Sequence, residues 1–222
     1  LESQAGLRQF SLERMTGYGI DYADAVELRA RILGGEDWRL SATALAEEAI
    51  AAAERPAPRA LVPTQIACHL RASALLRMSQ ALMLEDDHER HAIVVRASDH
   101  FARAAELGGN RRRVVIETDG GPLAGWLAPA QGEARGSAII IGGVEGWAMD
   151  FDSTGEALAR RGVNALTLDG PGQGESRIVH RHYLTPRWLG AFRKAIDFLS
   201  GESPVAPIGI VGNSMGGGIA LA

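Results

Sequence analysis

Residues 207–217 read PIGIVGNSMGG, a short apolar run followed by a serine between glycines. The form Gly-x-Ser-x-Gly after a strand-like run is typical of a nucleophile elbow, in which a serine occupies a sharp turn between a strand and a helix. Glycines at Gly212 and Gly216 keep side chains out of this tight turn. The stretch therefore predicts Ser214 as a nucleophile, and the alternative is an ordinary glycine-rich turn between a strand and a helix.

A second glycine-rich loop supplies a candidate oxyanion donor. Residues 142–146, GGVEG, follow a continuous apolar run of the buried-strand type, where an enzyme with such an elbow places one donor. We assign this donor to the backbone N–H of Val144 and pair it with that of Met215, at the start of the helix after the serine. Gly217 and Gly218 are expected to let that helix pack close to the sheet.

The second half of the chain alternates between strand and helix patterns. Strands are predicted over residues 113–117, 123–127, 137–141, 163–168 and 208–211. A capping box at Ser153 predicts a helix that reaches Arg161, and Thr185 followed by Pro186 predicts the start of another. Strands that alternate with helices favour an α/β fold with a mostly parallel sheet, which has about five strands before the serine.

The first half of the chain has the periodicity of helices. Helices are predicted over residues 21–33, 41–53, 64–84 and 86–107, with Ser41 as the N-cap of the second. Gly108 and Gly109 then mark the change of pattern. We therefore expect two domains, an all-helical domain over residues 1–108 and an α/β domain over residues 109–222.

Composition excludes several classes of function. The formal net charge of −4 gives no electrostatic reason to expect nucleic acid or an anionic membrane as a partner. Cys68 is the only cysteine, so an internal disulfide is excluded. No run approaches the roughly 18 apolar residues of a membrane span, and no His, Cys or carboxylate cluster has metal-ligand spacing. We expect a cytoplasmic protein that uses neither a metal nor another cofactor.

Residues 169–176, DGPGQGES, contain a glycine pattern close to a dinucleotide-binding fingerprint. The third glycine of that fingerprint is missing, and no long helix opens directly from the loop. We therefore interpret the segment as a tight structural loop beside the candidate site.

Together, LDGPGQGES at 168–176, GNSMGG at 212–217 and GGVEGW at 142–147 resemble the α/β-hydrolase superfamily. Within it, the chain resembles the branch of 2,6-dihydroxypseudooxynicotine hydrolases and FrsA-like esterases. This resemblance implies an α/β-hydrolase sheet preceded by a helical lid domain that covers the active site, and it suggests a homodimer. It also implies cleavage of a C–C bond next to a ketone by a serine triad.

The acidic residue implicated in that branch matches Glu145. A partly buried, protonated carboxyl at this position would help to bind or protonate a substrate carbonyl or enol. The alternative is a structural Glu145 that forms hydrogen bonds to the loop backbone.

The rest of a triad is not evident in the chain. In α/β hydrolases the acid and the histidine follow the serine, yet no Asp, Glu or His follows Ser214. His180 and His182 lie in the loop after GQGES and are expected to pack there or on the surface. The strand at 208–211 would also form a bare apolar edge. We therefore expect the chain to be the front portion of a longer polypeptide, with acid and histidine beyond Ala222.

These features favour a serine-nucleophile hydrolase that acts on a small-molecule carbonyl compound. The resemblance implies hydrolysis of a C–C bond in a β-diketone-like or aryl-ketone-like substrate. Two alternatives remain open, a carboxylesterase or thioesterase, and a catalytically inactive binding module with the same fold. The sequence does not decide whether Tyr18, Tyr22 and Trp38 line the substrate pocket or pack in the helical core.

Overall fold

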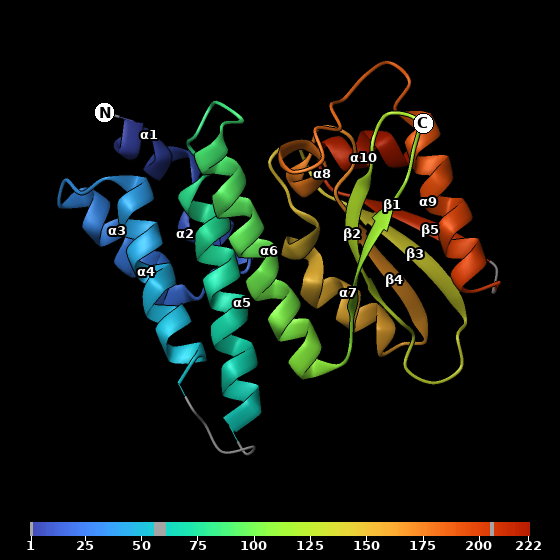
Figure 1. The fold of residues 1–222 in the computed structure, drawn as a ribbon, viewed down its shortest axis with the longest axis horizontal. Helices are drawn as coiled ribbons and strands as arrows, with labels where there is room; N and C mark the ends of the chain where they lie inside the picture. Colours follow the sequence, from blue (N-terminus) through green and yellow to red (C-terminus); the bar gives the residue numbers. More distant parts are fainter. Residues whose placement is uncertain (1, 56–60, 205–206) are drawn as a thin grey trace. The chain divides into compact units, whose positions relative to one another are not determined.

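The computed structural model describes residues 2–55, 61–204 and 207–222, which form two compact units. Unit 1 comprises residues 1–108 and unit 2 residues 109–222 (Figure 1). The division falls between Gly108 and Gly109, where the sequence pattern changes from helical to strand-like. The assignment of unit 1 as a lid stays a prediction.

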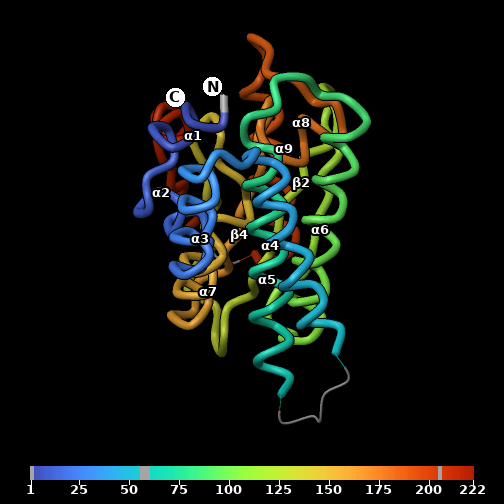
Figure 2. The backbone as a smooth tube through the Cα atoms, turned by 90° about the vertical axis from the view of Figure 1, so that its left-hand side faces the viewer, coloured from blue at the N-terminus to red at the C-terminus, as the bar shows by residue number. Residues whose placement is uncertain are grey.

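The described part of unit 1 contains only helices: α1 (Glu2–Gln9), α2 (Leu12–Gly17), α3 (Tyr22–Leu33), α4 (Trp38–Ala53), α5 (Val62–Ser79) and α6 (His88–Gly108). Helix α5 packs between α4 and α6, and Figures 1 and 2 show the three side by side. The helical pattern of this half was therefore predicted correctly. The sequence analysis gave no range for α1 or α2, which precede the residues with a clear apolar periodicity.

Side-chain caps explain where two of these helices begin. Asp21 caps α3 by accepting the N–H of Ala23 at 2.9 Å, and Asp37 caps α4 by accepting the N–H of Leu40 at 3.0 Å. The prediction of Ser41 as the N-cap of α4 is wrong. Ser41 lies in the first turn, where its hydroxyl donates to Glu36 at 2.8 Å. The N-cap is Asp37, four residues before Ser41, because its carboxylate reaches the free N–H groups first.

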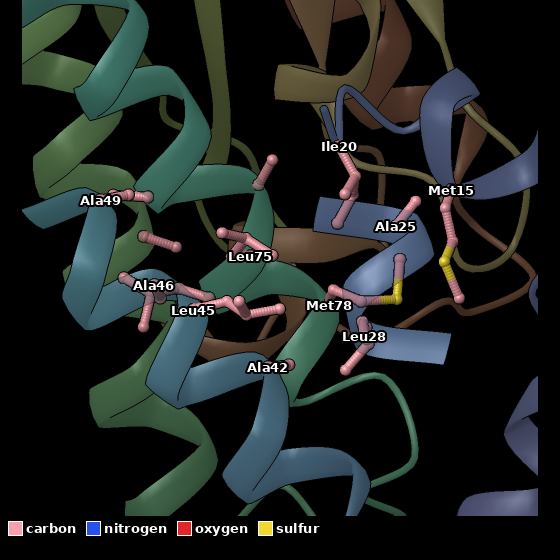
Figure 3. Close-up of a cluster of buried hydrophobic side chains, with 14 of the residues drawn as sticks. Met15, Ile20, Ala25, Leu28, Ala42, Leu45, Ala46, Ala49, Leu75 and Met78 are labelled. Carbon is pink, nitrogen blue, oxygen red and sulfur yellow. The ribbon is translucent and has the colours of Figure 1, made fainter. Parts of the chain in front are cut away.

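The core of unit 1 is built around Trp38 and a row of small residues on α4. Trp38 is 1% exposed, donates its indole N–H to the carbonyl of Met78 at 2.9 Å and packs against Phe10. Alanines on α4 allow α5 to approach closely. Figure 3 shows the buried cluster, whose labelled members are Met15, Ile20, Ala25, Leu28, Ala42, Leu45, Ala46, Ala49, Leu75 and Met78.

The three aromatic residues left open by the sequence take different positions. Trp38 belongs to the core of unit 1, and Tyr18 is partly buried against that core. Tyr22 is 64% exposed at the first position of α3. Core packing thus accounts for Trp38 and Tyr18 but not for Tyr22.

Unit 2 contains one sheet of five strands within the described residues: β1 (Arg112–Ile116), β2 (Leu123–Ala128), β3 (Gly136–Ile141), β4 (Val163–Leu168) and β5 (Ile208–Gly212). Their order is β1-β2-β4-β3-β5. Strand β2 is antiparallel to β1 and β4, whereas β3 is parallel to β4 and β5. The predicted mostly parallel sheet is therefore correct, and each strand lies within one residue of its predicted bounds.

Helices cover both faces of this sheet (Figure 1). Leu166 and Leu168 of β4 belong to the cluster that α9 (Leu189–Glu202) buries through Phe192 and Leu199. The alternate residue Thr167 faces α7 (Asp152–Ala159), because a Cβ on Gly155 would lie 3.5 Å from its methyl group. The central strands are therefore buried on both sides, which explains their continuous apolar sequences.

Two predicted helix starts in unit 2 are wrong. Ser153 does not cap α7, because a 3₁₀ turn, η2 (Ala148–Phe151), runs directly into the helix. Thr185 does not cap α9 either: its hydroxyl accepts the N–H of Arg187 at 3.4 Å in a preceding turn, and the helix begins at Leu189. In both places a local turn comes before the helix, and at Thr185 that turn uses the capping hydroxyl.

Unit 1 also contains a histidine pair that joins α5 to α6. The Nδ1 atoms of His69 and His100 are 3.0 Å apart, and their ring centroids are 5.3 Å apart. The centroid separation exceeds the nitrogen separation by about twice the distance from an imidazole centroid to its own nitrogen. Both nitrogens therefore lie near the line between the centroids, which is the geometry of an end-on hydrogen bond. One Nδ1 donates and the other accepts, so the accepting ring is neutral.

Burial is the main cause that lowers the pKa of both histidines below the ordinary value. The surrounding charged groups have smaller effects in both directions and come from the end of α4 and from α6: Glu54, Arg96, Asp99 and Arg103. Burial thus opposes protonation of either ring, and protonation of the accepting ring would break this link between the two helices.

We predict that unit 1 loses stability as the pH falls below about 6.5, the value at which histidine titrates in an unfolded chain. There the unfolded chain binds protons that the folded pair does not, so the free energy of unfolding falls. Thermal unfolding followed by circular dichroism between pH 8 and pH 5 measures this dependence.

The variant His100→Gln keeps an amide that can pair with His69 but does not titrate. It should cost about 1 kcal/mol at pH 8 and should weaken the pH dependence. The matched control is His88→Gln, at an exposed histidine on the same helix, which should behave like the wild type. Equal pH dependence in all three proteins would contradict the role of the pair.

Candidate active site at the carboxyl ends of the parallel strands

Three loops meet where the parallel strands β3, β4 and β5 end. They are the loop at 142–146 after β3, the loop at 169–173 after β4, and the turn from β5 into α10 (Met215–Ala220). Loops at this edge of an open α/β sheet commonly form binding sites. The structure thus brings together the three segments that the sequence analysis singled out.

Ser214 occupies the turn between β5 and α10 in a rare backbone conformation. Its φ is 53° and its ψ is −117°. Among the described residues other than glycine, only Arg181 also has a positive φ. Such a conformation costs of order 1–3 kcal/mol and persists only where the surrounding contacts enforce it. The strain expected at a nucleophile elbow is therefore present at Ser214.

The elbow fits against the end of β3 only because glycines surround the serine. The N–H of Asn213 donates to the carbonyl of Ile141 at 3.0 Å, and the N–H of Gly216 donates to that of Gly142 at 3.1 Å. A Cβ on Gly216 would overlap both carbonyls, and one on Gly212 would overlap the backbone of Gly216. Both positions therefore require glycine, as predicted.

The expectation for the next two glycines is not met. A Cβ on Gly217 would make only an ordinary contact, 3.5 Å from the carbonyl oxygen of Gly212, and one on Gly218 would meet nothing within 4 Å. The helix therefore approaches the sheet closely at Gly216 and not at Gly218, because only the first turn of α10 touches the end of β3.

The loop at 142–146 lies directly beside the serine. A Cβ on Gly143 would be 3.1 Å from the Cβ of Ser214 and 3.5 Å from its hydroxyl oxygen. Val144, the next residue, has an exposed side chain, and Met215 is half-buried. The predicted oxyanion donors thus belong to the two segments that flank Ser214, although their role stays a prediction.

Glu145 belongs to the same loop and its side chain is exposed. The sequence analysis tied a proton-donating role to partial burial of this carboxyl. That burial is not found in the described structure, so the role of Glu145 stays a prediction.

The loop after β4 is tied to its neighbours by two buried side chains that the sequence analysis did not single out. The carboxylate of Asp169 accepts the N–H groups of Ala148 at 2.6 Å and Glu175 at 2.8 Å. The amide of Gln173 donates to the carbonyls of Gly142 at 2.8 Å and Gly143 at 2.6 Å. The loop therefore has the structural role predicted for it, because its side chains bind the segment beside Ser214. Polar residues between glycines were the only sequence signal for it.

An ion pair between a buried glutamate and a partly exposed arginine anchors the far side of this loop. Glu175, in α8 (Gly174–Ile178), is 1% exposed and pairs with Arg113 of β1. The Nε2 of His180 lies 4.0 Å from the same carboxylate. Burial lowers the pKa of His180, the charge of Arg113 lowers it further, and Glu117 opposes the shift. This group holds α8 against β1.

The histidines of unit 2 do not lie near the serine. His182 is buried against the turn between β1 and β2, with its Nδ1 3.3 Å from the carbonyl of Pro122, and His180 lies beside Arg113 of β1. Strands β4 and β3 lie between β2 and β5, so at the usual strand spacing β2 and β5 are about 14 Å apart. A general base must lie about 3 Å from the hydroxyl it deprotonates, so neither ring can serve Ser214. Both pack in loops, as expected.

The described residues contain neither a cluster suited to a metal ion nor a helix suited to crossing a membrane. No three His, Cys, Asp or Glu side chains among them are grouped so that they could hold a metal ion. None of the described helices combines the length and the apolar character that crossing a bilayer requires.

We predict that Gly216→Ala destabilises unit 2 by about 1–3 kcal/mol, because the added methyl group overlaps two backbone carbonyls. Gly218→Ala lies in the same helix but meets nothing within 4 Å, and it should raise stability by up to about 1 kcal/mol. Urea unfolding of both variants and the wild type provides the comparison. Equal effects of the two substitutions would show that the close approach at Gly216 is not needed.

Known proteins resemble the chain over different lengths. The sequence signature of the family described as "Serine aminopeptidase, S33" matches residues 132–222. Hydrolase LUC6 from Fusarium sp. is 28% identical over 227 aligned residues, which cover 91% of this chain and 53% of that protein. The 2,6-dihydropseudooxynicotine hydrolase of Paenarthrobacter nicotinovorans is 29% identical, over 91% of this chain and 55% of that protein. The chain spans about half the length of these curated relatives.

Solved structures show the same fold. The crystal structure of 2,6-dihydroxy-pseudo-oxynicotine hydrolase covers 94% of this chain with a TM-score of 0.78 and 24% identity, and the match covers 59% of that structure. The structure of AbyA5 covers 88% of this chain and matches over 55% of its own length, with a TM-score of 0.67 and 20% identity.

The strand order with an antiparallel β2, the serine at the end of β5 and these likenesses all agree. They bear out the predicted fold and the predicted resemblance to the branch that includes 2,6-dihydroxypseudooxynicotine hydrolase. The chain therefore has the α/β-hydrolase fold, and its residues 132–222 match the signature of an α/β-hydrolase family.

Proposed function

We propose that this chain carries the nucleophile of a serine hydrolase that acts on a carbonyl compound. The observation that supports the proposal most strongly is the strained backbone of Ser214, packed against Gly143 of the loop after β3. Residues with a strained backbone conformation cluster at functional sites. The names of the two curated relatives, both hydrolases, support the same class.

In this mechanism the oxygen of Ser214 attacks the substrate carbonyl carbon. The backbone N–H groups of Val144 and Met215 stabilise the resulting oxyanion, because preorganised donors act where negative charge develops. A histidine takes the serine proton and passes it to the leaving group. The proposal leaves this histidine and its acid unassigned, since His180 and His182 lie too far from β5.

We propose hydrolysis of a C–C bond beside a ketone as the reaction. The bond between the acyl carbon and its neighbouring carbon breaks, and its electron pair moves into the second carbonyl as an enolate. Protonation at carbon then releases the ketone, and water hydrolyses the acyl-enzyme. The similarity to a 2,6-dihydropseudooxynicotine hydrolase over 91% of this chain supports this choice.

Ester or thioester hydrolysis is the second candidate. An ester needs the nucleophile and the oxyanion donors but no donor that protonates a carbon leaving group. The candidate for such a donor, Glu145, has an exposed side chain. This exposure is the observation that favours the second candidate. In both reactions the proposed substrate is a small carbonyl compound, and the helical unit is proposed to act as a lid. A homodimer remains a proposal.

We predict that a fluorophosphonate probe labels the native protein at Ser214 and that Ser214→Ala abolishes labelling and lowers hydrolysis by a factor on the order of 10⁴–10⁶. Ser200→Ala, at an exposed serine on α9, should leave both unchanged. Mass spectrometry of the labelled peptide identifies the site. A native protein that shows neither labelling nor turnover would instead be a binding module with the hydrolase fold.

A substrate pair separates the two reactions. If the enzyme cleaves C–C bonds, Glu145→Gln should slow hydrolysis of an aryl β-diketone by about 10–100-fold, because a proton donor is lost. Hydrolysis of a p-nitrophenyl ester should change less than about threefold. Glu133→Gln, at an exposed glutamate in the loop between β2 and β3, is the control. Fast ester turnover without diketone cleavage would establish the esterase instead.

A further inference from the structure

The side chain of Gln173 is held in one orientation by hydrogen bonds to three backbone groups. The residue is 1% exposed, and its side-chain oxygen accepts the N–H of Gly170 at 2.9 Å. Its NH₂ group donates to the carbonyls of Gly142 and Gly143, at 2.8 Å and 2.6 Å. The reverse orientation would place an amide oxygen against two carbonyl oxygens, so the bonding partners decide the assignment.

This contact also determines where the next N–H group points. The carbonyl of Gly143 and the N–H of Val144 belong to one planar trans peptide, so they point in opposite directions. With the carbonyl fixed on Gln173, the N–H of Val144 is directed to the other side of the loop. A free peptide at this glycine could rotate, because glycine restrains its backbone least.

The opposite side of the same loop faces the nucleophile. Gly143 lies against Ser214. The carbonyl of Gly142 accepts the N–H of Gly216 at 3.1 Å and also accepts a hydrogen bond from the side-chain amide of Gln173. The loop is therefore held between the elbow and Gln173. The carbonyl of Gly143 accepts two hydrogen bonds, one from the side chain of Gln173 and one from the N–H of Gly146 at 3.1 Å.

The backbone of Gln173 is held in place by hydrogen bonds as well. Its backbone N–H donates to the carbonyl of Gly170, and its own carbonyl accepts the N–H of Arg177 in α8. Asp169 fixes the start of that helix by accepting the N–H of Glu175. A donor held in this way can position a loop without reorganising when charge develops nearby.

We propose that Gln173 is a positioning residue for the oxyanion donor: by binding the carbonyl of Gly143, it aims the N–H of Val144 at the oxygen of the bound substrate. The inference rests on the proposed function, because the orientation of that peptide affects catalysis only if the N–H of Val144 binds an oxyanion. Gln173 is separated from the substrate by the loop, and so it acts through Val144 rather than by contact.

The test compares Gln173→Met and Gln173→Asn with a substitution of another buried amide, which lies in β4. Methionine keeps the volume without hydrogen bonds, and asparagine keeps the amide on a shorter chain. The control is Asn164→Leu, because Asn164 is buried at the start of β4, accepts the N–H of Ala130 at 2.9 Å and donates to Ser137 at 3.3 Å. Both substitutions remove a buried amide from unit 2, but only Gln173 binds the loop beside the elbow.

Both Gln173 variants should lower kcat by about 10–100-fold, less than the loss expected on removing an oxyanion donor itself, and should change KM less than about threefold. Amide hydrogen exchange in residues 142–147 should accelerate at least about tenfold. Asn164→Leu should lower the unfolding temperature while kcat stays within about twofold. An unchanged kcat in Gln173→Met or Gln173→Asn, with a lowered unfolding temperature, would reduce Gln173 to a structural residue.

The exchange measurement does not require catalytic activity. Unchanged exchange in residues 142–147 would overturn the inference even in an active hydrolase. A wild-type protein without hydrolase activity, but with faster loop exchange in the variants, would overturn the proposed function and leave the loop-holding role of Gln173 in place.

Discussion

The site depends on one contact between main chains, the two hydrogen bonds that join the end of β3 to the turn after β5. The N–H groups of Asn213 and Gly216 bond to the carbonyls of Ile141 and Gly142, and no side chain intervenes. This approach is possible only because Gly216 lacks a Cβ. The contact enforces the unusual backbone of Ser214, since a strained residue persists only where its surroundings determine its conformation.

Much of the fold could be predicted from the sequence, because its signals are local. The buried runs of β3 and β4 and the glycines around Ser214 each identify their structure from a few adjacent residues. Helix starts were harder to predict. Ser41, Ser153 and Thr185 all have good capping chemistry, but a nearby acidic residue or a preceding turn satisfied the helix instead. Local capping rules give candidates, and the competition among neighbours decides between them.

The site was predictable only in part, for a different reason. Ser214 and the glycine loop carry recognisable patterns, whereas the function of Gln173 and Asp169 lies in contacts with residues far away in the sequence. A lone glutamine between glycines has no pattern that reveals which carbonyls it binds. The exposure of Glu145 was equally unreadable, because it depends on how the loop is folded and not on its sequence.

The bonds between Ile141 and Asn213 and between Gly142 and Gly216 join positions roughly seventy residues apart, so they form only when a long segment of chain has closed on itself. Strand β3 pairs directly with both β4 and β5, so the two bonds extend the parallel pairing of β3 with β5 beyond the ends of the strands. Before that closure nothing local holds Ser214 at a positive φ. The nucleophile's geometry is therefore a property of the assembled sheet, and partly folded chains do not possess it.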